Sequence, residues 1–354
     1  MSSEPAEGAE YSLRDRKALA KFLQDADIRL VRAEYLYELR RSNRPLPRRQ
    51  EAQQETLALV SHEHVVEWSA GGRDAILCSV SHSWESQQHP DPCCFQLEKL
   101  VSCVALYDAA YFSEIWIFYD YISLFQFERQ TPEEEESFRR SMANMHVMYA
   151  HEHCLTFRLE CLTPDDFWLN NSEQKVPVYH VPSKSIQTIP LRELLHNPIP
   201  YKMRGWCLAE IEWSSAKSAT KKNQQIDAVQ IESGASFRGK VPMAPKEFEK
   251  HMANSKFTHR HDAPQVIKLQ EKIFHEKVTV CEEVHFENLP EGEVMQLAKS
   301  LPFYHRLRIL QLLNFEANER EAHALGEALG AHEVLQKLQI RANSAKTAKA
   351  IVKA

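Results

Sequence analysis

The segment Arg204–Ile211, with the sequence RGWCLAEI, contains Glu210, the acidic residue of this chain that is the best candidate for a chemical role. On its own, the segment has the pattern of a buried helix start, because a Trp-Cys-Leu triplet at helical spacing suits a core. Two roles are open for Glu210. It is either the functional carboxylate of a site or one half of an ion pair with Arg204 on the helix surface.

Polar side chains also follow two apolar runs. Residues 75–80 lead into Ser81-His82-Ser83-Trp84, and residues 115–119 lead into Asp120. Continuous apolar runs of this length suit strands buried on both faces of a parallel sheet. Ligands of such sheets bind outside the carboxyl ends of the strands, so these residues are candidates for binding. His82 has two open roles, contact with a phosphate or ribose and packing that fixes the loop. Asp120 is expected to cap its loop through backbone amides.

The elements that must position these residues alternate along the chain. Helical spacing predicts one long or two short helices over Ser12–Arg41 and another over Gln50–Val66. Thr131, Pro132 and Glu134 mark the start of a later helix. Strands are expected over residues 75–80, 115–119, 154–159 and 226–231, and a helix over 201–215, with a long loop between 159 and 201. Strand-helix alternation predicts an α/β domain with a doubly wound parallel sheet.

The C-terminal part has an internal repeat. Leu297, Leu301 and Leu307 recur 28 residues later as Leu325, Leu329 and Leu335, and the pairs 310/338 and 312/340 follow the same period. A Leu-x-x-Leu-x-Leu run followed by a helical half is typical of long leucine-rich repeats. About two and a half repeats are visible, so the segment must either lean on a neighbour or be a truncated solenoid. We expect helices over residues 1–67, an α/β domain over 68–235, a linker over 236–277 and the repeats over 278–354.

Composition narrows the function classes. The 354 residues carry a net charge of −6, which favours neither nucleic acid nor an anionic membrane as partner. No apolar stretch approaches the roughly 20 residues that span a bilayer, and we expect a cytoplasmic protein with reduced, mostly buried cysteines. Few glycines and no phosphate-binding loop argue against nucleotide hydrolysis of the P-loop kind. The cluster His151-Glu152-His153-Cys154 lacks a second pair at a zinc-finger spacing, so no metal is expected.

Three motifs of the middle segment share their order and spacing with a known family. They are Ser81-His82-Ser83-Trp84, the segment Ile115–Gln126, and Glu128-Arg129 followed by Met145–Tyr149. This series resembles the HET (heterokaryon incompatibility) domain. The chain departs from it where Glu85 replaces a glycine and where Ser123-Leu124-Phe125-Gln126 replaces a Cys-Ile-Asn-Gln segment.

A second motif, Trp206-Cys207-Leu208-Ala209-Glu210-Ile211, resembles the Trp-Cys-Leu-x-Glu-Leu segment of plant-type TIR domains. The glutamate of that segment is their catalytic residue. HET domains are regarded as distant relatives of the TIR fold, so the two resemblances, which cover about residues 70–235, support each other. They imply a TIR-like (flavodoxin-like) parallel sheet flanked by helices.

The resemblance implies cleavage of the bond between nicotinamide and ribose in NAD, with Glu210 stabilising the positive charge that develops on the ribose. NAD would be the substrate, and no cofactor would be required. The residues expected to bind it, by stacking or through ribose and phosphate oxygens, are Ser81, His82, Ser83, Trp84, Asp120 and Trp206. The alternative is a non-catalytic interaction module that self-associates through its α/β domain and binds protein partners through its repeats.

Overall fold

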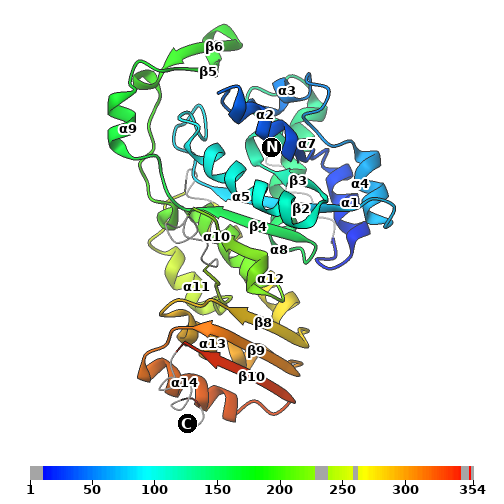
Figure 1. The fold of residues 1–354 in the computed structure, drawn as a ribbon, viewed down its shortest axis with the longest axis vertical. Helices are drawn as coiled ribbons and strands as arrows, with labels where there is room; N and C mark the ends of the chain where they lie inside the picture. The colour runs from blue at the N-terminus through cyan, green and yellow to red at the C-terminus, as the bar shows by residue number, and fades with distance from the viewer. Residues whose placement is uncertain (1–10, 228–237, 258–261, 344–350, 352–354) are drawn as a thin grey trace, which may run out of the picture. The chain divides into compact units, whose positions relative to one another are not determined.

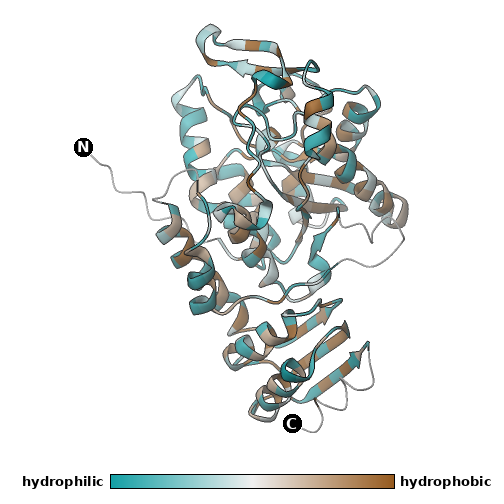
Figure 2. Cartoon of the chain, turned by 90° about the vertical axis from the view of Figure 1, so that its left-hand side faces the viewer, coloured by the Kyte–Doolittle hydropathy of each residue, from teal (hydrophilic) through white to brown (hydrophobic). Residues whose placement is uncertain are grey.

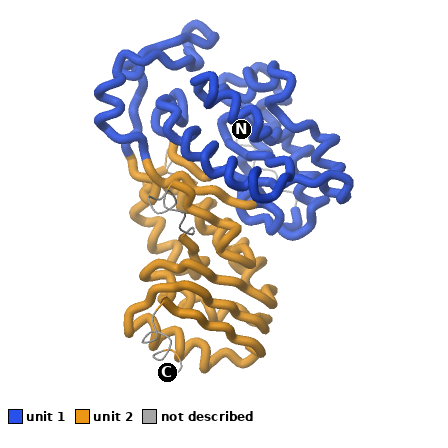
Figure 3. Tube along the Cα trace, viewed as in Figure 1, with its two compact units in different colours: residues 1–80, 84–154, 162–198 blue, residues 81–83, 155–161, 199–354 orange. Residues whose placement is uncertain are grey.

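The computed structural model describes residues 11–227, 238–257, 262–343 and 351 of the chain (Figure 1). It is a mixed α/β structure whose central sheet is mostly parallel and flanked by helices, as expected from the alternating pattern. The chain divides into two compact units (Figure 3). The first contains residues 1–80, 84–154 and 162–198, and the second contains residues 81–83, 155–161 and 199–354.

The first unit begins with short helices. The stretch 12–41 forms two of them, α1 (Arg16–Asp25) and α2 (Ala33–Arg41), separated by the two-residue strand β1 (Val31–Arg32). The single helix expected over Gln50–Val66 is wrong. That stretch holds α3 (Arg49–Ala52) and the start of α4 (His62–Ser69). Ser61 explains the break, because its side chain accepts a hydrogen bond from the backbone N–H of His64 and so caps a new helix.

Five strands form the central sheet, in the order β1-β3-β2-β4-β7. Strand β2 (Ala75–His82) pairs in parallel with β3 (Glu114–Phe118), and β4 (Cys154–Leu159) pairs in parallel with β7 (Asn223–Gln225). Strand β1 runs antiparallel to β3. The expected strands over 75–80, 115–119 and 154–159 are confirmed. The fourth expected strand, over 226–231, does not coincide with β7: residues 226–227 are not in a strand, and residues 228–231 lie outside the described residues.

The helices between these strands are α5 (Phe95–Tyr111), α6 (Asp120–Ser123), α7 (Pro132–Asn144), α8 (His146–Ala150) and α10 (Gly205–Ser215). Helix α7 begins as its sequence indicates. The Thr131 hydroxyl accepts a hydrogen bond from the Glu134 backbone N–H at 3.2 Å. The Glu134 carboxylate accepts one from the Gln130 backbone N–H at 2.6 Å, one residue before the cap. Local chemistry at the helix end therefore determines where α7 starts.

The segment between β4 and α10 is more ordered than the long loop that we expected. It contains α9 (Asp165–Asn170) and an antiparallel hairpin of β5 (Lys175–His180) and β6 (Ser185–Pro190). Short 3₁₀ turns follow at Leu191–Glu193 and Tyr201–Met203, the latter labelled η3. Pro177 lies inside β5 and masked the strand pattern, although prolines are tolerated in the edge strands of a two-stranded sheet.

The stretch expected to be a linker, residues 236–277, contains helices. They are α11 (Pro245–Met252) and α12 (Asp262–Val278). Helix α12 buries Val266, Ile273 and Phe274, a spacing of seven and eight residues that places them on one helix face. The charged residues between them hid this face in the sequence.

The C-terminal repeats form a second sheet, which is parallel and has the order β10-β9-β8. Its elements are β8 (Glu283–Glu287), α13 (Glu293–Ser300), β9 (Ile309–Phe315), α14 (Glu319–Gly330) and β10 (Lys337–Ala342). Residues related by the 28-residue period are register partners, as in the pairs Leu310/Leu338 and Leu312/Ile340. Figure 2 shows apolar and polar residues alternating along these strands.

The repeats lean on a neighbour, as their small number requires. Phe274 and Val278 of α12 share one apolar core with Leu297, Leu310 and Leu325. The free edge of β8 is covered by residues 218–220. There the Thr220 hydroxyl accepts a hydrogen bond from the Glu287 backbone N–H at 2.9 Å.

Among the described residues, no helix has both the length and the apolar character needed to cross a bilayer.

Candidate functional site

The two chemical motifs of the sequence meet in the second unit through Ser81 and Glu210. Ser81 lies near the carboxyl end of β2, and Glu210 lies in the middle of α10. The Ser81 Oγ donates a hydrogen bond to Glu210 Oε2 over 2.5 Å. Glu210 is 9% exposed, so its carboxylate does not lie on an open helix surface.

Tyr201, from η3, extends this contact into a chain of hydroxyls. Its Oη lies 2.5 Å from Ser81 Oγ. Because Ser81 gives its single proton to Glu210, Tyr201 is the donor in this second hydrogen bond. Burial, followed by the electrostatic influence of Cys207, Glu160 and Glu210, raises the pKa of Tyr201 well above its usual value. The phenol therefore stays protonated, and the order is Tyr201 to Ser81 to Glu210.

Two further charged residues surround Tyr201. Arg158, near the end of β4, forms an ion pair with Glu160, and Glu160 Oε2 lies 3.1 Å from Lys202 Nζ. The Arg158 and Glu160 side chains are only 5% and 6% exposed. With Ser81 and Glu210 they form a buried polar cluster, which we call the carboxylate cluster: Ser81, Arg158, Glu160, Tyr201 and Glu210.

The sequence interpretation missed three members of the carboxylate cluster. Arg158 interrupts an apolar strand run, which is a visible signal, because a charged residue inside a buried strand needs a partner. Glu160 follows two residues later. Tyr201 stands in a proline-bearing segment and gives no signal of its own.

Close packing explains the glycine at the start of α10. A side chain at Gly205 would collide with the ring of Phe257. The Gly205 backbone N–H donates to the Lys256 carbonyl at 2.8 Å, and the Lys256 N–H donates to the Met203 carbonyl at 2.7 Å. These bonds fix the first turn of α10, and with it the direction in which Glu210 points.

Trp206 has different partners from Glu210. Its Nε1 donates to Asp262 Oδ2 over 3.1 Å, and its ring meets Trp213 edge-on with centroids 6.3 Å apart. It is half-buried where α10 packs on α12. Trp206, expected to stack on a ligand, therefore packs on Trp213 of its own helix and bonds to Asp262 of α12.

His82 and Ser83 are enclosed beside the same helix. His82 is 6% exposed, and its carbonyl accepts a weak hydrogen bond from the Cys207 thiol at 3.4 Å. Ser83 is fully buried. Both residues extend the end of β2 alongside α10, which agrees with the packing role that was left open for His82.

Trp84 and Asp120 form a pair of their own in the first unit. Trp84 Nε1 donates to Asp120 Oδ2 over 2.9 Å, and Asp120 Oδ1 accepts from the Tyr121 backbone N–H at 2.6 Å. Asp120, the first residue of α6, thus bonds a neighbouring backbone amide, as expected of it. Glu85, which departs from the HET pattern, is buried and accepts from Gln96 Nε2 at 3.1 Å and from the Thr163 N–H at 3.0 Å.

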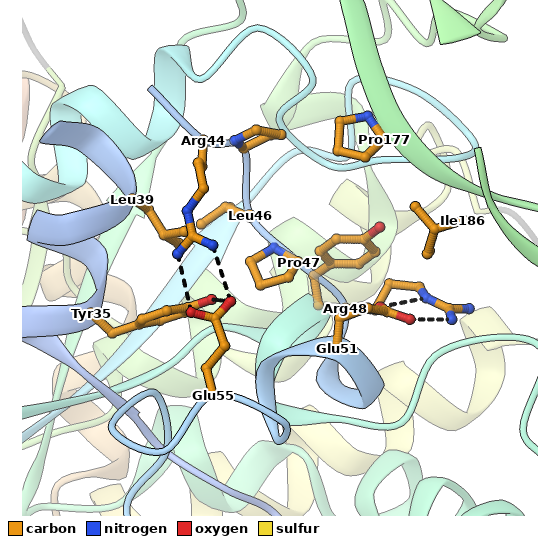
Figure 4. Close-up of a pocket in the computed structure, with 12 residues that line it drawn as sticks. Tyr35, Leu39, Arg44, Leu46, Pro47, Arg48, Glu51, Glu55, Pro177 and Ile186 are labelled. Carbon is orange, nitrogen blue, oxygen red and sulfur yellow. Dashed lines mark hydrogen bonds and ion pairs between the residues drawn. The ribbon is translucent and has the colours of Figure 1, made fainter. Parts of the chain in front are cut away.

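A pocket of about 200 Å³ lies elsewhere in the first unit (Figure 4). Its charged groups are already paired. Arg44 forms two hydrogen bonds with Glu55, which also accepts from the Tyr35 hydroxyl, and Arg48 forms two with Glu51. The rest of the lining is largely apolar, namely Leu39, Pro45, Leu46, Pro47, Tyr121, Pro177 and Ile186. This pocket offers shape and apolar contact rather than a reactive carboxylate.

Most cysteines, and His151, are buried inside the fold. All eight cysteines are thiols, and six are buried, as expected. His151 contacts the Asp15 carbonyl through Nε2 at 3.1 Å, and its Nδ1 accepts from the His153 backbone N–H at 3.2 Å. Within the described part of the chain, no three His, Cys, Asp or Glu side chains converge as metal ligands would.

Comparison with family models, curated proteins and solved structures gives no match for this chain.

Proposed function

We propose that this chain is a TIR/HET-like intracellular effector that hydrolyses the nicotinamide-ribose bond of NAD through Glu210. The proposal rests on one observation above all. The Glu210 carboxylate, picked out by the RGWCLAE motif, is hydrogen-bonded to Ser81 of the separate Ser-His-Ser-Trp motif. Two sequence signals that are 129 positions apart thus belong to one buried cluster.

The strand order supports the TIR-like fold. The strands β2, β3, β4 and β7 follow one another in the chain but lie in the order β3-β2-β4-β7. Their spatial order is thus second, first, third, fourth, which matches the beginning of the flavodoxin-like order. In such sheets the ligand crevice lies where the strand order reverses, at the carboxyl ends of the first and third strands. Ser81 and Arg158 come from those two strand ends.

The chemistry suits a lone carboxylate flanked by hydroxyls. Water adds to the ribose C1′ carbon, the C–N bond breaks, and its electron pair leaves with nicotinamide. The products are nicotinamide, ADP-ribose and a proton. Positive charge develops on the ribose ring, and an anionic Glu210 stabilises it. The ribose hydroxyls would take the place that the Ser81 and Tyr201 hydroxyls hold around the carboxylate.

Product analysis tests this proposal. The full chain is incubated with NAD, both dilute and concentrated enough to associate, and the products are separated by chromatography. Equal amounts of nicotinamide and ADP-ribose support the proposal. Intact NAD under both conditions, or cleavage at the pyrophosphate instead, would refute it.

A second candidate function, a non-catalytic interaction module, is favoured by the β8–β10 repeats. Their helices α13 and α14 bury Val294, Leu297 and Leu325 against one face of the sheet, and its other face carries polar and charged side chains. In this case Glu210 serves only to anchor α10 on β2. Binding of a protein partner that survives Glu210→Gln, without any NAD cleavage by the wild type, would favour it.

A further inference from the structure

The sheet β8–β10 has one face turned away from its helices, which we call the outer face. Buried residues such as Val284, Leu310 and Leu312 alternate with more exposed ones along the strands. The side chains between them point to the opposite side, because successive residues of a strand alternate in direction. The outer face consists of Glu283, His285, Glu287, Ile309, Gln311, Leu313, Lys337, Gln339 and Arg341.

The register arranges these side chains in three straight rows across the sheet. The first row is Glu283, Ile309 and Lys337, and the last is Glu287, Leu313 and Arg341. Each of these rows runs from an acidic residue on β8, through an apolar one on β9, to a basic one on β10. The middle row, His285-Gln311-Gln339, adds no fixed charge. The β8 flank of the outer face is therefore acidic and the β10 flank is basic. The central strand, β9, carries an apolar residue in the first row and another in the last.

Three of the four charged residues, Glu283, Lys337 and Arg341, are exposed to a partner, and Glu287 is half-buried. The side chains of Glu283 and His285 are 51% and 41% exposed, and His285 Nε2 lies 2.9 Å from Glu283 Oε1. Ile309 and Leu313 are only half-buried, although they stand at the centre of the sheet. A pair of half-buried apolar side chains between two charged flanks marks a surface suited to a complementary partner.

The dimensions of the outer face select the kind of partner. Three strands about 4.8 Å apart, each five to seven residues long, span roughly 14 Å by 17–23 Å. That area, on the order of 300 Å², is well below the roughly 800 Å² per partner of a stable protein dimer. It corresponds to one α-helix, which is about 10–12 Å wide with its side chains, over about three turns.

We propose that the outer face binds one amphipathic α-helix of about 12 residues from a protein partner. The helix lies along the strands, with an apolar stripe on Ile309 and Leu313. Its basic flank faces Glu283 and Glu287, and its acidic flank faces Lys337 and Arg341. This proposal does not depend on Glu210 or on NAD cleavage.

The test uses three synthetic helical peptides of 14 residues with the same leucine stripe. The first has lysines on one flank and glutamates on the other, the second has lysines on both, and the third has glutamates on both. Binding to the full chain is measured by fluorescence anisotropy at low salt. We expect the mixed peptide to bind about tenfold more tightly than either control, because each control replaces attractions between exposed charges by repulsions.

Reversing the charges of the outer face should change which of the three peptides binds most tightly. Glu283→Lys with Glu287→Lys makes both flanks basic and should favour the all-glutamate peptide. Lys337→Glu with Arg341→Glu should favour the all-lysine peptide. The matched control, Glu319→Lys with Glu327→Lys on α14, should leave the preference for the mixed peptide unchanged. Equal binding of the three peptides, or none, would overturn the proposal. So would a dimer of the full chain that only the outer-face reversals dissociate, because the occupant would then be a second copy.

Discussion

Ser81 donates a hydrogen bond to Glu210 over 2.5 Å, which joins the end of strand β2 to the middle of helix α10. Both residues are at least nine-tenths buried. A carboxylate in this position needs donors, since a buried charge without hydrogen bonds is costly. Ser81 therefore both stabilises the fold and holds the Glu210 carboxylate in place.

The stability role gives the first prediction. Ser81→Ala removes a donor from a buried carboxylate and should lower the free energy of unfolding by about 1.5–3 kcal/mol, as for other hydrogen bonds to charged groups. Urea denaturation followed by circular dichroism measures the loss. Ser102→Ala serves as the control, because that exposed serine bonds only to the carbonyl of Glu98 on its own helix. Equal losses in both variants would show that the Ser81 contact adds no stability.

Arg49 gives a prediction of the opposite sign. It is 3% exposed, lies over the Phe125 ring at 5.1 Å and reaches Asp27 only at 3.7 Å. Its Nε and Nη1 atoms have no hydrogen-bond partner among the residues that the structure describes, and burial lowers its pKa to about 10. Arg49→Met keeps the volume without the charge and should stabilise the chain by about 1–2 kcal/mol. Arg49→Ala, which leaves a cavity, should not. A destabilised methionine variant in thermal unfolding would contradict this account.

The repeats offer a comparison within one period. Leu310 is fully buried, whereas its register partner Leu338 is 44% exposed. Leu310→Ala should cost about 2–5 kcal/mol, and Leu338→Ala less than about 1 kcal/mol. Hydrogen exchange of the β8–β10 amides in the two variants measures the loss of stability within this sheet. Similar losses of protection would mean that β10 is packed as tightly as β9.

Glu247 on α11 makes part of the stability dependent on pH. Hydrogen bonds from Lys299 and Lys250 lower its pKa to about 2, below the value near 4.5 of an unfolded chain. The carboxylate therefore stabilises the fold above about pH 4.5, and this contribution is lost as the pH falls toward 2. The pairs are partly exposed, so the contribution is under about 1 kcal/mol. Glu247→Gln should lower the melting temperature clearly at pH 6 and much less at pH 2.5, where most of the contribution is already lost. The exposed neighbour variant Glu249→Gln should change neither, and a loss in Glu247→Gln that is as large at pH 2.5 as at pH 6 would rule out the ion pairs as its cause.

Local patterns in the sequence were sufficient for much of the fold. The apolar runs predicted β2, β3 and β4, Thr131 predicted the start of α7, and the 28-residue period predicted the register of Leu310 with Leu338. Each of these features depends on residues that are close in sequence or repeat regularly.

The sequence-based predictions are wrong where tertiary contacts, and not the local residue pattern, determine the secondary structure. Strand β7, Asn223-Gln224-Gln225, is polar and exists only because β4 supplies its hydrogen bonds. Helix α12 buries widely spaced residues, and β5 contains a proline. The same holds for the carboxylate cluster. Motifs in the sequence indicate Glu210 and Ser81, whereas Tyr201, Arg158 and Glu160 are recognised only in the folded chain.

The rate of nicotinamide release by Glu210→Gln, relative to the wild type, tests the central claim most directly. Glutamine keeps the size of the side chain and can still accept a hydrogen bond from Ser81, but it carries no negative charge for the ribose cation. We expect the rate to fall by about a hundredfold or more, as when a comparable electrostatic contact is removed from other enzymes. Glu249→Gln, which makes the same change on the exposed face of α11, should retain the wild-type rate. A Glu210→Gln variant that folds normally and cleaves NAD as fast as the wild type would contradict the account.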